Sequence, residues 1–278
     1  MPTGKILSLL DQAYAAGMTV YTVWGGEPLL AERLPEWLQR ARKYRMQTVV
    51  CTAGFRLEER AKEIGPYVER LLLSVEGIGE KQDRLRATPG LFARIVAGIR
   101  AFRGHSSGVI CCWSNLTREN LDQVEEIARF AQDQEIGVEF FPAAVFPGFN
   151  ERLILSSEER NQAFARILDL KRRGYPIRNT GYALELMRSG RPFRCNFARL
   201  SVQVSSRGEI SACEPRLVPG LAPYGAIEDL DLRSLRSWPR YHQERERLLS
   251  CNRCLFPCVA HMADGLVLQS LRAALSPR

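Results

Sequence analysis

The 278-residue sequence alternates five times between an amphipathic helical pattern and a short apolar run typical of a β-strand. The predicted helices are Lys5–Ala16, Leu29–Arg45, Leu57–Tyr67, Gly90–Arg103 and Glu119–Gln134, followed by a sixth at Ser157–Arg173. The predicted strands after the first five helices are Thr19–Trp24, Gln47–Thr52, Arg70–Val75, Gly108–Trp113 and Gly137–Pro142. Strands that are apolar on both faces and separated by helices form parallel sheets with right-handed crossovers. The pattern therefore predicts an α/β layer, either barrel-like or doubly wound.

A glycine turn follows the first predicted strand. The carboxyl ends of parallel strands line the functional site of such folds, so this turn is a candidate site. In Trp24-Gly25-Gly26-Glu27-Pro28 the two glycines allow a sharp turn that exposes backbone amides, and Pro28 starts the next helix. The turn and its carboxylate are suited to a charged amino group, but Gly-Gly after a strand is also common in an ordinary turn.

Composition excludes several classes of protein. With 45% hydrophobic and 25% charged residues the chain has an ordinary globular balance, which excludes disorder, collagen and coiled coil. No run approaches the roughly 18 apolar residues that cross a bilayer, so we expect a soluble, cytoplasmic protein without membrane contact. The net charge of +8 is spread along predicted helices, at residues 40–45, 171–173 and 240–247. These runs favour solvated helix faces over nucleic-acid binding.

The pattern changes after Gly174. A short helix is predicted at Tyr182–Ser189, and alternation in Leu200–Val204 and Glu209–Cys213 predicts a β-hairpin. A loop at 215–224 and an Arg- and Leu-rich helical run then lead to the last cysteines. We therefore predict two domains, residues 1–178 and residues 179–278.

Five of the eight cysteines cluster in the second predicted domain: Cys195, Cys213, Cys251, Cys254 and Cys258. Because no signal exports the chain, clustered cysteines indicate metal ligands rather than disulfides. Thiolates select iron-sulfur clusters or zinc, and apolar neighbours such as Leu255 and Phe256 favour iron-sulfur without excluding a four-cysteine zinc site. Five thiols exceed the four ligands that either site needs, and five buried free thiols are the remaining alternative. The other three cysteines, Cys51, Cys111 and Cys112, fall inside strands and are predicted to be core residues.

These motifs together resemble the radical S-adenosylmethionine superfamily, in particular members with a C-terminal iron-sulfur extension of the SPASM or twitch type. Gly25-Gly26-Glu27-Pro28 is similar to the GGEP motif, which in relatives binds the amino group of the methionine moiety. Thr52-Ala53-Gly54 stands where relatives often have Thr-Asn-Gly, and Ser74-Val75-Glu76-Gly77 stands where many have Ser-Leu-Asp-Gly near the ribose. The spacing of Cys195, Gly208 and Cys213 is similar to the opening of the SPASM pattern, and the shortened closing Cys-x2-Cys-x3-Cys implies one auxiliary cluster.

The resemblance implies an incomplete TIM-like (β/α) barrel of parallel strands with a small, cysteine-rich α+β domain at the C-terminal end. It implies S-adenosylmethionine and an auxiliary 4Fe-4S cluster as cofactors. The implied cofactor-binding residues are Gly25, Gly26, Glu27, Pro28, Ser74 and Glu76, and the implied metal ligands are the five clustered cysteines. The implied partners are a peptide or small-molecule substrate and an electron-donor protein, with no specific substrate indicated.

One departure from the family pattern matters. The printed sequence has no Cys-x3-Cys-x2-Cys before its first helix, where the superfamily holds its catalytic cluster. We therefore expect this chain to be inactive in radical chemistry as given, to lack an upstream segment, and to expose Thr19–Trp24 as an aggregation-prone sheet edge. The alternative is a non-catalytic cysteine-metal module that binds a peptide or small ligand.

The roles of three histidines and one asparagine can also be predicted. His105, His242 and His261 are scattered and are predicted to be surface or packing residues rather than catalytic bases. Asn115 ends a predicted strand region and is predicted to contact the cofactor.

Overall fold

A five-stranded parallel sheet forms the centre of the computed structural model, which describes residues 1–218, 220–252 and 254–256. The strands lie in chain order: β1 (Val20–Val23), β2 (Gln47–Thr52), β3 (Arg70–Ser74), β4 (Val109–Leu116) and β5 (Gly137–Pro142). Each pairs in parallel with its neighbour. The predicted parallel α/β layer is confirmed, and β4 extends beyond its predicted end.

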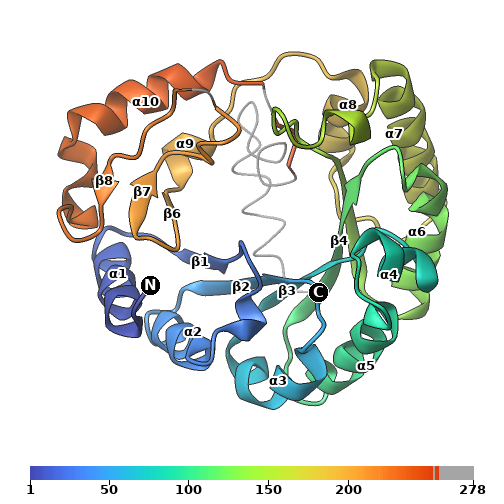
Figure 1. Ribbon diagram of the computed structural model, residues 1–278, viewed down its shortest axis with the longest axis horizontal. Coiled ribbons are helices and arrows are strands. Elements are labelled where there is room, and N and C mark those ends of the chain that lie inside the picture. Colours follow the sequence, from blue (N-terminus) through green and yellow to red (C-terminus); the bar gives the residue numbers. More distant parts are fainter. Residues whose placement is uncertain (219, 253, 257–278) are drawn as a thin grey trace.

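The helices that connect the strands lie outside the curved sheet (Figure 1). They are α1 (Thr3–Ala15), α2 (Leu34–Lys43), α3 (Leu57–Ile64), α4 (Glu80–Leu85), α5 (Leu91–Arg103), α6 (Val124–Asp133) and α7 (Ser157–Arg172). Alternate strand residues such as Val50, Leu73 and Phe140 are fully buried toward these helices. Because the helices cover the outer face of a curved sheet, the fold is an incomplete barrel and not a doubly wound layer.

Several helical predictions differ from the structure. The helix predicted from Glu119 is preceded by a 3-10 turn (Leu121–Gln123) and starts only at Val124, and the helix predicted to end at Tyr67 finishes in a 3-10 turn (Gly65–Tyr67). The segment predicted as one helix from Leu29 begins with a 3-10 turn (Pro28–Leu30), and α2 starts only at Leu34, with a proline in its first turn. Helix α4 was not predicted, because its sequence Glu-Lys-Gln-Asp-Arg-Leu has a single apolar residue and therefore no helical periodicity.

The free edge of β5 is covered by the segment that follows α7. Val138 donates to the carbonyl of Pro176, and Arg178 donates back to Val138, at 3.0 and 2.8 Å. The fully buried Asn179 side chain then accepts from the N–H of Phe140 at 2.8 Å and donates to its carbonyl at 3.0 Å. The side-chain amide of Asn179 thus pairs with β5 in the way that a peptide group of a neighbouring strand would.

The C-terminal elements include the predicted hairpin, in which β6 (Gln203–Val204) pairs antiparallel with β7 (Glu209–Ser211). A third strand, β8 (Gly225–Ala226), pairs with β7 just beyond the predicted loop. The helices here are α8 (Gly181–Ser189), α9 (Phe197–Leu200) and α10 (Pro239–Leu249), preceded by a 3-10 segment (Leu232–Ser237).

The C-terminal strands pack beside α1 and so continue the ring of elements from the side of β1 (Figure 1). Leu10 of α1 shares one apolar cluster with Ile210 and Leu232. The backbone N–H of Leu232 donates to Gln12 of α1 at 3.1 Å, and Lys5 pairs with Glu228. Helix α1 therefore connects the barrel to the C-terminal strands.

Strand β1 is the edge of the sheet formed by the described residues, and Val20 is 49% exposed. Its neighbour Tyr21 packs toward the cluster that α1 shares with the C-terminal strands. Across the part of the chain that the structure describes, no helix has the length and apolar character needed to cross a membrane.

Candidate S-adenosylmethionine site and cysteine cluster

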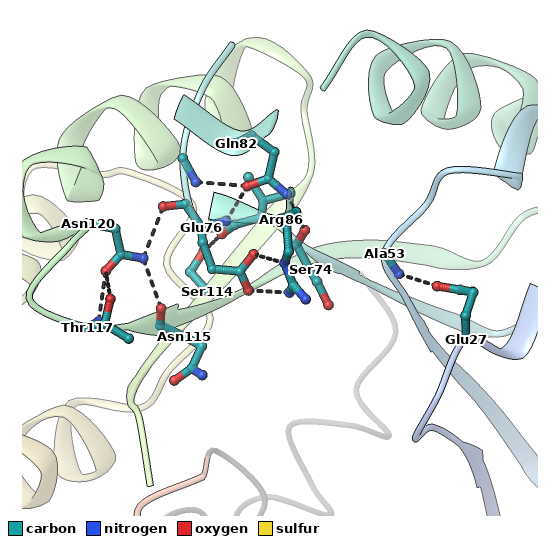
Figure 2. Close-up of polar contacts among 12 residues, drawn as sticks. Glu27, Ala53, Ser74, Glu76, Gln82, Arg86, Ser114, Asn115, Thr117 and Asn120 are labelled. Atoms are coloured by element: carbon teal, nitrogen blue, oxygen red, sulfur yellow. Dashed lines mark hydrogen bonds and ion pairs between the residues drawn. The ribbon is translucent and has the colours of Figure 1, made fainter. Parts of the chain in front are cut away.

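The loops that follow β1, β2 and β3 lie at the carboxyl edge of the sheet, where Glu27 and Ala53 form one group of contacts and the residues around Glu76 form another (Figure 2). The glycine turn follows β1, Ala53 and Gly54 follow β2, and residues 74–77 end β3 and begin the next loop. The sequence prediction that these motifs lie together is supported by direct contacts between the first two loops.

Glu27 ties the first two loops together. Its Oε1 accepts from the N–H of Leu29 at 3.0 Å and from the hydroxyl of Thr52 at 2.5 Å, and its Oε2 accepts from the N–H of Ala53 at 2.8 Å. The Thr52 hydroxyl in turn accepts from the N–H of Gly54 at 2.9 Å. Both oxygens of the Glu27 carboxylate are thus engaged within the protein, which gives this carboxylate a structural role in shaping the mouth of the barrel.

The peptide groups of the glycine turn remain open to solvent. Gly25 and Gly26 have φ of 81° and 58°, in the left-handed region that favours glycine, and both are exposed. A ligand at this turn therefore meets backbone groups before it meets the Glu27 side chain.

Arg60 fixes the chain just after the turn, and sequence analysis did not identify it. This side chain of α3 is 5% exposed and donates to the carbonyls of Leu29, Ala31 and Glu32 at 2.8 to 3.4 Å. Its Nε also meets Glu63 at 2.8 Å. A buried guanidinium with all its donors engaged holds this segment in one conformation.

Gln82 of α4 holds the loop after β3. Its side-chain oxygen accepts from the N–H groups of Glu76 and Gly77 at 2.8 and 3.0 Å, and its side-chain nitrogen donates to the carbonyl of Ser74 at 2.9 Å. Gln82 is fully buried, so these three bonds replace water that the loop has lost.

Two further side chains complete this support. The hydroxyl of Ser114 on β4 donates to the carbonyl of Val75 at 2.6 Å. The Asn120 amide donates to the carbonyls of Glu76 and Asn115, at 3.0 and 2.9 Å. The backbone of the loop is therefore fixed from α4, from β4 and from the segment before α6.

The Glu76 carboxylate forms a bidentate ion pair with Arg86, with Nε to Oε2 at 2.7 Å and Nη2 to Oε1 at 2.6 Å (Figure 2). Burial raises the pKa of Glu76, and the charge and hydrogen bonds of Arg86 oppose this rise. The charges of Glu76 and, to a smaller extent, Glu27 raise the pKa of Arg86. Ser74 hydrogen-bonds Cys51, whose pKa burial raises to about 12.

Two polar atoms on β4 have no hydrogen-bond partner among the described residues: Trp113 Nε1 and Asn115 Oδ1. Both atoms are buried, and the Asn115 side chain points away from Asn120 (Figure 2). The ring of Trp113 lies 4.8 Å from that of Phe141 and 6.5 Å from that of Trp24. An unpaired buried donor and acceptor mark this inner strand face as a place that a ligand group can satisfy.

The predicted metal ligands that the structure describes line one cavity. Cys195, Cys213, Cys251 and Cys254 all face it, while Cys258 lies outside the described residues. Burial raises the pKa of Cys195, and it raises that of Cys213 to about 12, with Cys251 adding to both. Within residues 1–218, 220–252 and 254–256, no group of three or more His, Cys, Asp or Glu side chains meets the geometry of a metal site.

The sequence analysis named the glycine turn, Ser74, Glu76 and the cysteines as candidate site residues, but it did not identify the residues that hold the loop around Glu76. Gln82, Arg86 and Asn120 lie on a short polar helix or in a loop, where neither periodicity nor a motif marks them. Cys111 and Cys112 are buried in β4 as predicted. His105 and His242 are exposed, in agreement with the prediction, and His261 lies outside the described residues.

Residues 1–131 match the family model of the Radical SAM superfamily. Among similar proteins, PqqA peptide cyclase of Granulibacter bethesdensis is 21% identical over 247 residues, covering 86% of this chain and 64% of that protein. The S-adenosylmethionine-dependent nucleotide dehydratase of Lacinutrix mariniflava is 30% identical over 84 residues, covering 30% of this chain and 18% of that protein.

Solved structures with this fold include Streptococcus suis SuiB bound to S-adenosylmethionine, at a TM-score of 0.70 and 17% identity, covering 88% of this chain and 61% of that one. Native anSMEcpe with bound AdoMet gives a TM-score of 0.69 at 16% identity, covering 90% of this chain and 76% of that one. At these identities the likeness establishes the fold alone.

The family match therefore concerns residues 1–131, and the two solved structures share the barrel fold. The chain spans 18% and 64% of the lengths of the two relatives named above, so their activities are not transferred with the family.

The Glu27 contacts predict a loss of stability for Glu27→Gln. A glutamine offers one acceptor oxygen where the carboxylate offers two, so at least one of the three donors loses its partner. We expect the free energy of unfolding to fall by about 1–3 kcal/mol, measured by urea denaturation. The matched control is Glu32→Gln, an exposed position where we expect a change within about 0.5 kcal/mol. Equal stability of the two variants would contradict the structural role of Glu27.

Proposed function

We propose that the barrel, assigned to residues 1–178, binds S-adenosylmethionine at the mouth formed by the loops after β1, β2 and β3. The observation that carries this proposal is the preformed shape of these loops, whose peptide groups are held by Glu27, Gln82 and Asn120. A site whose groups are already ordered binds with a smaller entropic cost than one that must be assembled.

The contacts suggest how the ligand is divided among the residues. The methionine ammonium is a hydrogen-bond donor, and the exposed backbone of Gly25 and Gly26 offers acceptors beside Glu27, whose Oε2 accepts a single internal hydrogen bond. Pro28 starts the 3-10 turn that follows and limits the path of the chain. We assign the ribose hydroxyls to Ser74 and to the acceptor capacity that the internal partners of the Glu76 carboxylate leave.

Binding of radiolabelled S-adenosylmethionine by equilibrium dialysis tests this assignment. Glu76→Gln replaces an ionised acceptor, and we expect affinity to fall about tenfold, because hydrogen bonds to charged groups contribute about 1.5–3 kcal/mol. Glu80→Gln on the same loop-helix segment is the control, since its side chain is 93% exposed. If the native chain binds no S-adenosylmethionine at any accessible concentration, the assignment is wrong.

We further propose that residues 179–278 form a SPASM- or twitch-like domain that holds one auxiliary 4Fe-4S cluster. Four thiols that line a common apolar cavity are chemically suited to iron-sulfur ligation, since soft thiolates are its preferred ligands. Burial raises the pKa of Cys195 and Cys213, so these two thiols are protonated at neutral pH when no metal is bound. Binding of iron would therefore release protons and draw the side chains together.

Anaerobic incubation with iron and sulfide, followed by iron analysis and ultraviolet-visible spectroscopy, tests the auxiliary cluster. We expect about four irons per chain and a broad sulfide-to-iron absorption band. Cys213→Ala should lose most of both, whereas Cys111→Ala, in the buried core of β4, should retain them. A protein that takes up zinc and no iron-sulfur cluster would favour the alternative, a cysteine-metal binding module without radical chemistry.

The similarity to radical SAM enzymes also leads to a proposal for the activity of the whole protein. The bound cluster of radical SAM enzymes supplies the electron that cleaves S-adenosylmethionine. Because the printed sequence lacks the Cys-x3-Cys-x2-Cys that holds this cluster, we propose that residues 1–278 bind the cofactor but do not cleave it unaided. The proposed substrate is a peptide or a small molecule, in line with relatives named a peptide cyclase and a pre-heme d1 synthase. An electron-donor protein and a cytoplasmic location remain predictions.

A further inference from the structure

Arg86 is the cation that faces the Glu76 carboxylate. It lies at the C-terminal end of α4, and its guanidinium meets both carboxylate oxygens. The Glu76 side chain is 12% exposed and that of Arg86 is 35% exposed. On the same helix Arg84 pairs with Glu80 at 3.6 Å, but these side chains are 66% and 93% exposed. The pair formed by Arg86 is therefore shielded from water to a degree that its neighbour on the helix is not.

We propose that Arg86 is a positioning residue for S-adenosylmethionine, which keeps the Glu76 carboxylate ionised and in one orientation at the mouth of the barrel. This inference rests on the proposed function, because that function provides the ligand of Glu76. A bidentate arginine occupies one acceptor position on each carboxylate oxygen. The backbone N–H of Asn115 and the Gln82 side chain also hydrogen-bond this carboxylate, so a bound ligand meets only the acceptor capacity that these partners leave.

Among the described residues, Arg86 is the positively charged group that acts on the pKa of Glu76, so the ionised form of Glu76 depends on it. The titratable side chains that face Glu76 from the neighbouring strands are the thiols of Cys51 on β2 and Cys112 on β4. Burial raises the pKa of both thiols, so they are neutral at physiological pH. The backbone N–H of Asn115 contributes a hydrogen bond that also favours the carboxylate, but it has no net charge.

The direction of the effect follows from the pKa of Glu76. Burial raises this pKa, and Arg86 opposes the rise. Removal of the guanidinium charge therefore moves the pKa further upward, so that at neutral pH a larger fraction of Glu76 is the neutral acid. A neutral carboxyl group has one acceptor position fewer than a carboxylate and carries an O–H donor instead. It therefore binds less well to ligand hydroxyl groups that donate hydrogen bonds. Raising the pH restores the carboxylate and with it the binding.

The test is the pH dependence of S-adenosylmethionine binding for the native chain, Arg86→Gln and Arg86→Lys, from mildly acidic to mildly alkaline buffers. For Arg86→Gln we expect affinity to fall about tenfold for each unit by which the pKa of Glu76 exceeds the pH, and to recover in alkaline buffer. Arg86→Lys keeps the positive charge but loses the two parallel N–H donors of the guanidinium. The pH dependence of its binding should therefore follow that of the native chain, at a lower affinity. Arg84→Gln is the matched control and should not alter binding.

A double variant separates positioning from general structural damage. Arg86→Gln combined with Glu76→Gln should bind no more weakly than Glu76→Gln alone, and without pH dependence, because Arg86 acts through Glu76. The proposal is overturned if Arg86→Gln binds as the native chain does at every pH. A loss that is equal at all pH values would also overturn it, because that is the result of a purely structural role.

Failure of the proposed function gives a different result. In that case the native chain binds no S-adenosylmethionine, and an NMR titration of the Glu76 carboxyl carbon still decides the role of Arg86. The proposal requires a higher pKa of Glu76 in Arg86→Gln than in the native chain. Equal values would refute it independently of any ligand.

Discussion

Buried peptide groups must be paired, and this constraint determines the shape of the proposed cofactor site. A loop at the end of a buried strand has left the sheet ladder but has not reached water, so its N–H and carbonyl groups need partners. Here the partners are side chains: Glu27 serves the loop after β2, and Gln82 serves the loop after β3. Each bond contributes about 1 kcal/mol, and each donor left unpaired would cost more. The loops are consequently rigid without any ligand.

The ion pair between Glu76 and Arg86 adds charged groups to these hydrogen-bonded loops. A carboxylate at the mouth of a barrel is useful to a ligand only while it is ionised, and burial acts against ionisation. Arg86 opposes the effect of burial on the pKa of Glu76. The same low exposure that makes Glu76 a selective acceptor therefore makes it dependent on its partner.

The sequence predicted the strands and the motifs at their ends because these depend on local patterns. The first and last residues of β2 and β5 agree with the prediction, since an apolar run between polar turns marks where a buried strand begins and ends. Helix α4 was missed because six mostly polar residues show no periodicity, and Gln82 and Arg86 were missed with it. The tie between Asn179 and β5 depends on contacts across 39 residues, which no local pattern reveals.

The proposed S-adenosylmethionine site and the cysteine cluster differ in what determines their geometry. At the barrel mouth, internal hydrogen bonds fix the groups before a ligand arrives. In the C-terminal part, four thiols share a cavity, but their described side chains do not converge as metal ligands. The cysteine cluster is therefore proposed to gain its final geometry from the metal, whereas the S-adenosylmethionine site is proposed to exist without its cofactor.

Native-state amide hydrogen exchange, measured by NMR in the absence of S-adenosylmethionine, tests this preformed site most directly. The account predicts slow exchange for the amides of Ala53, Gly54, Glu76 and Gly77, approaching that of the neighbouring strands, because each donates to a fixed side chain. Exchange of these amides at the rate of an open loop, with protection only after the cofactor is added, would contradict it.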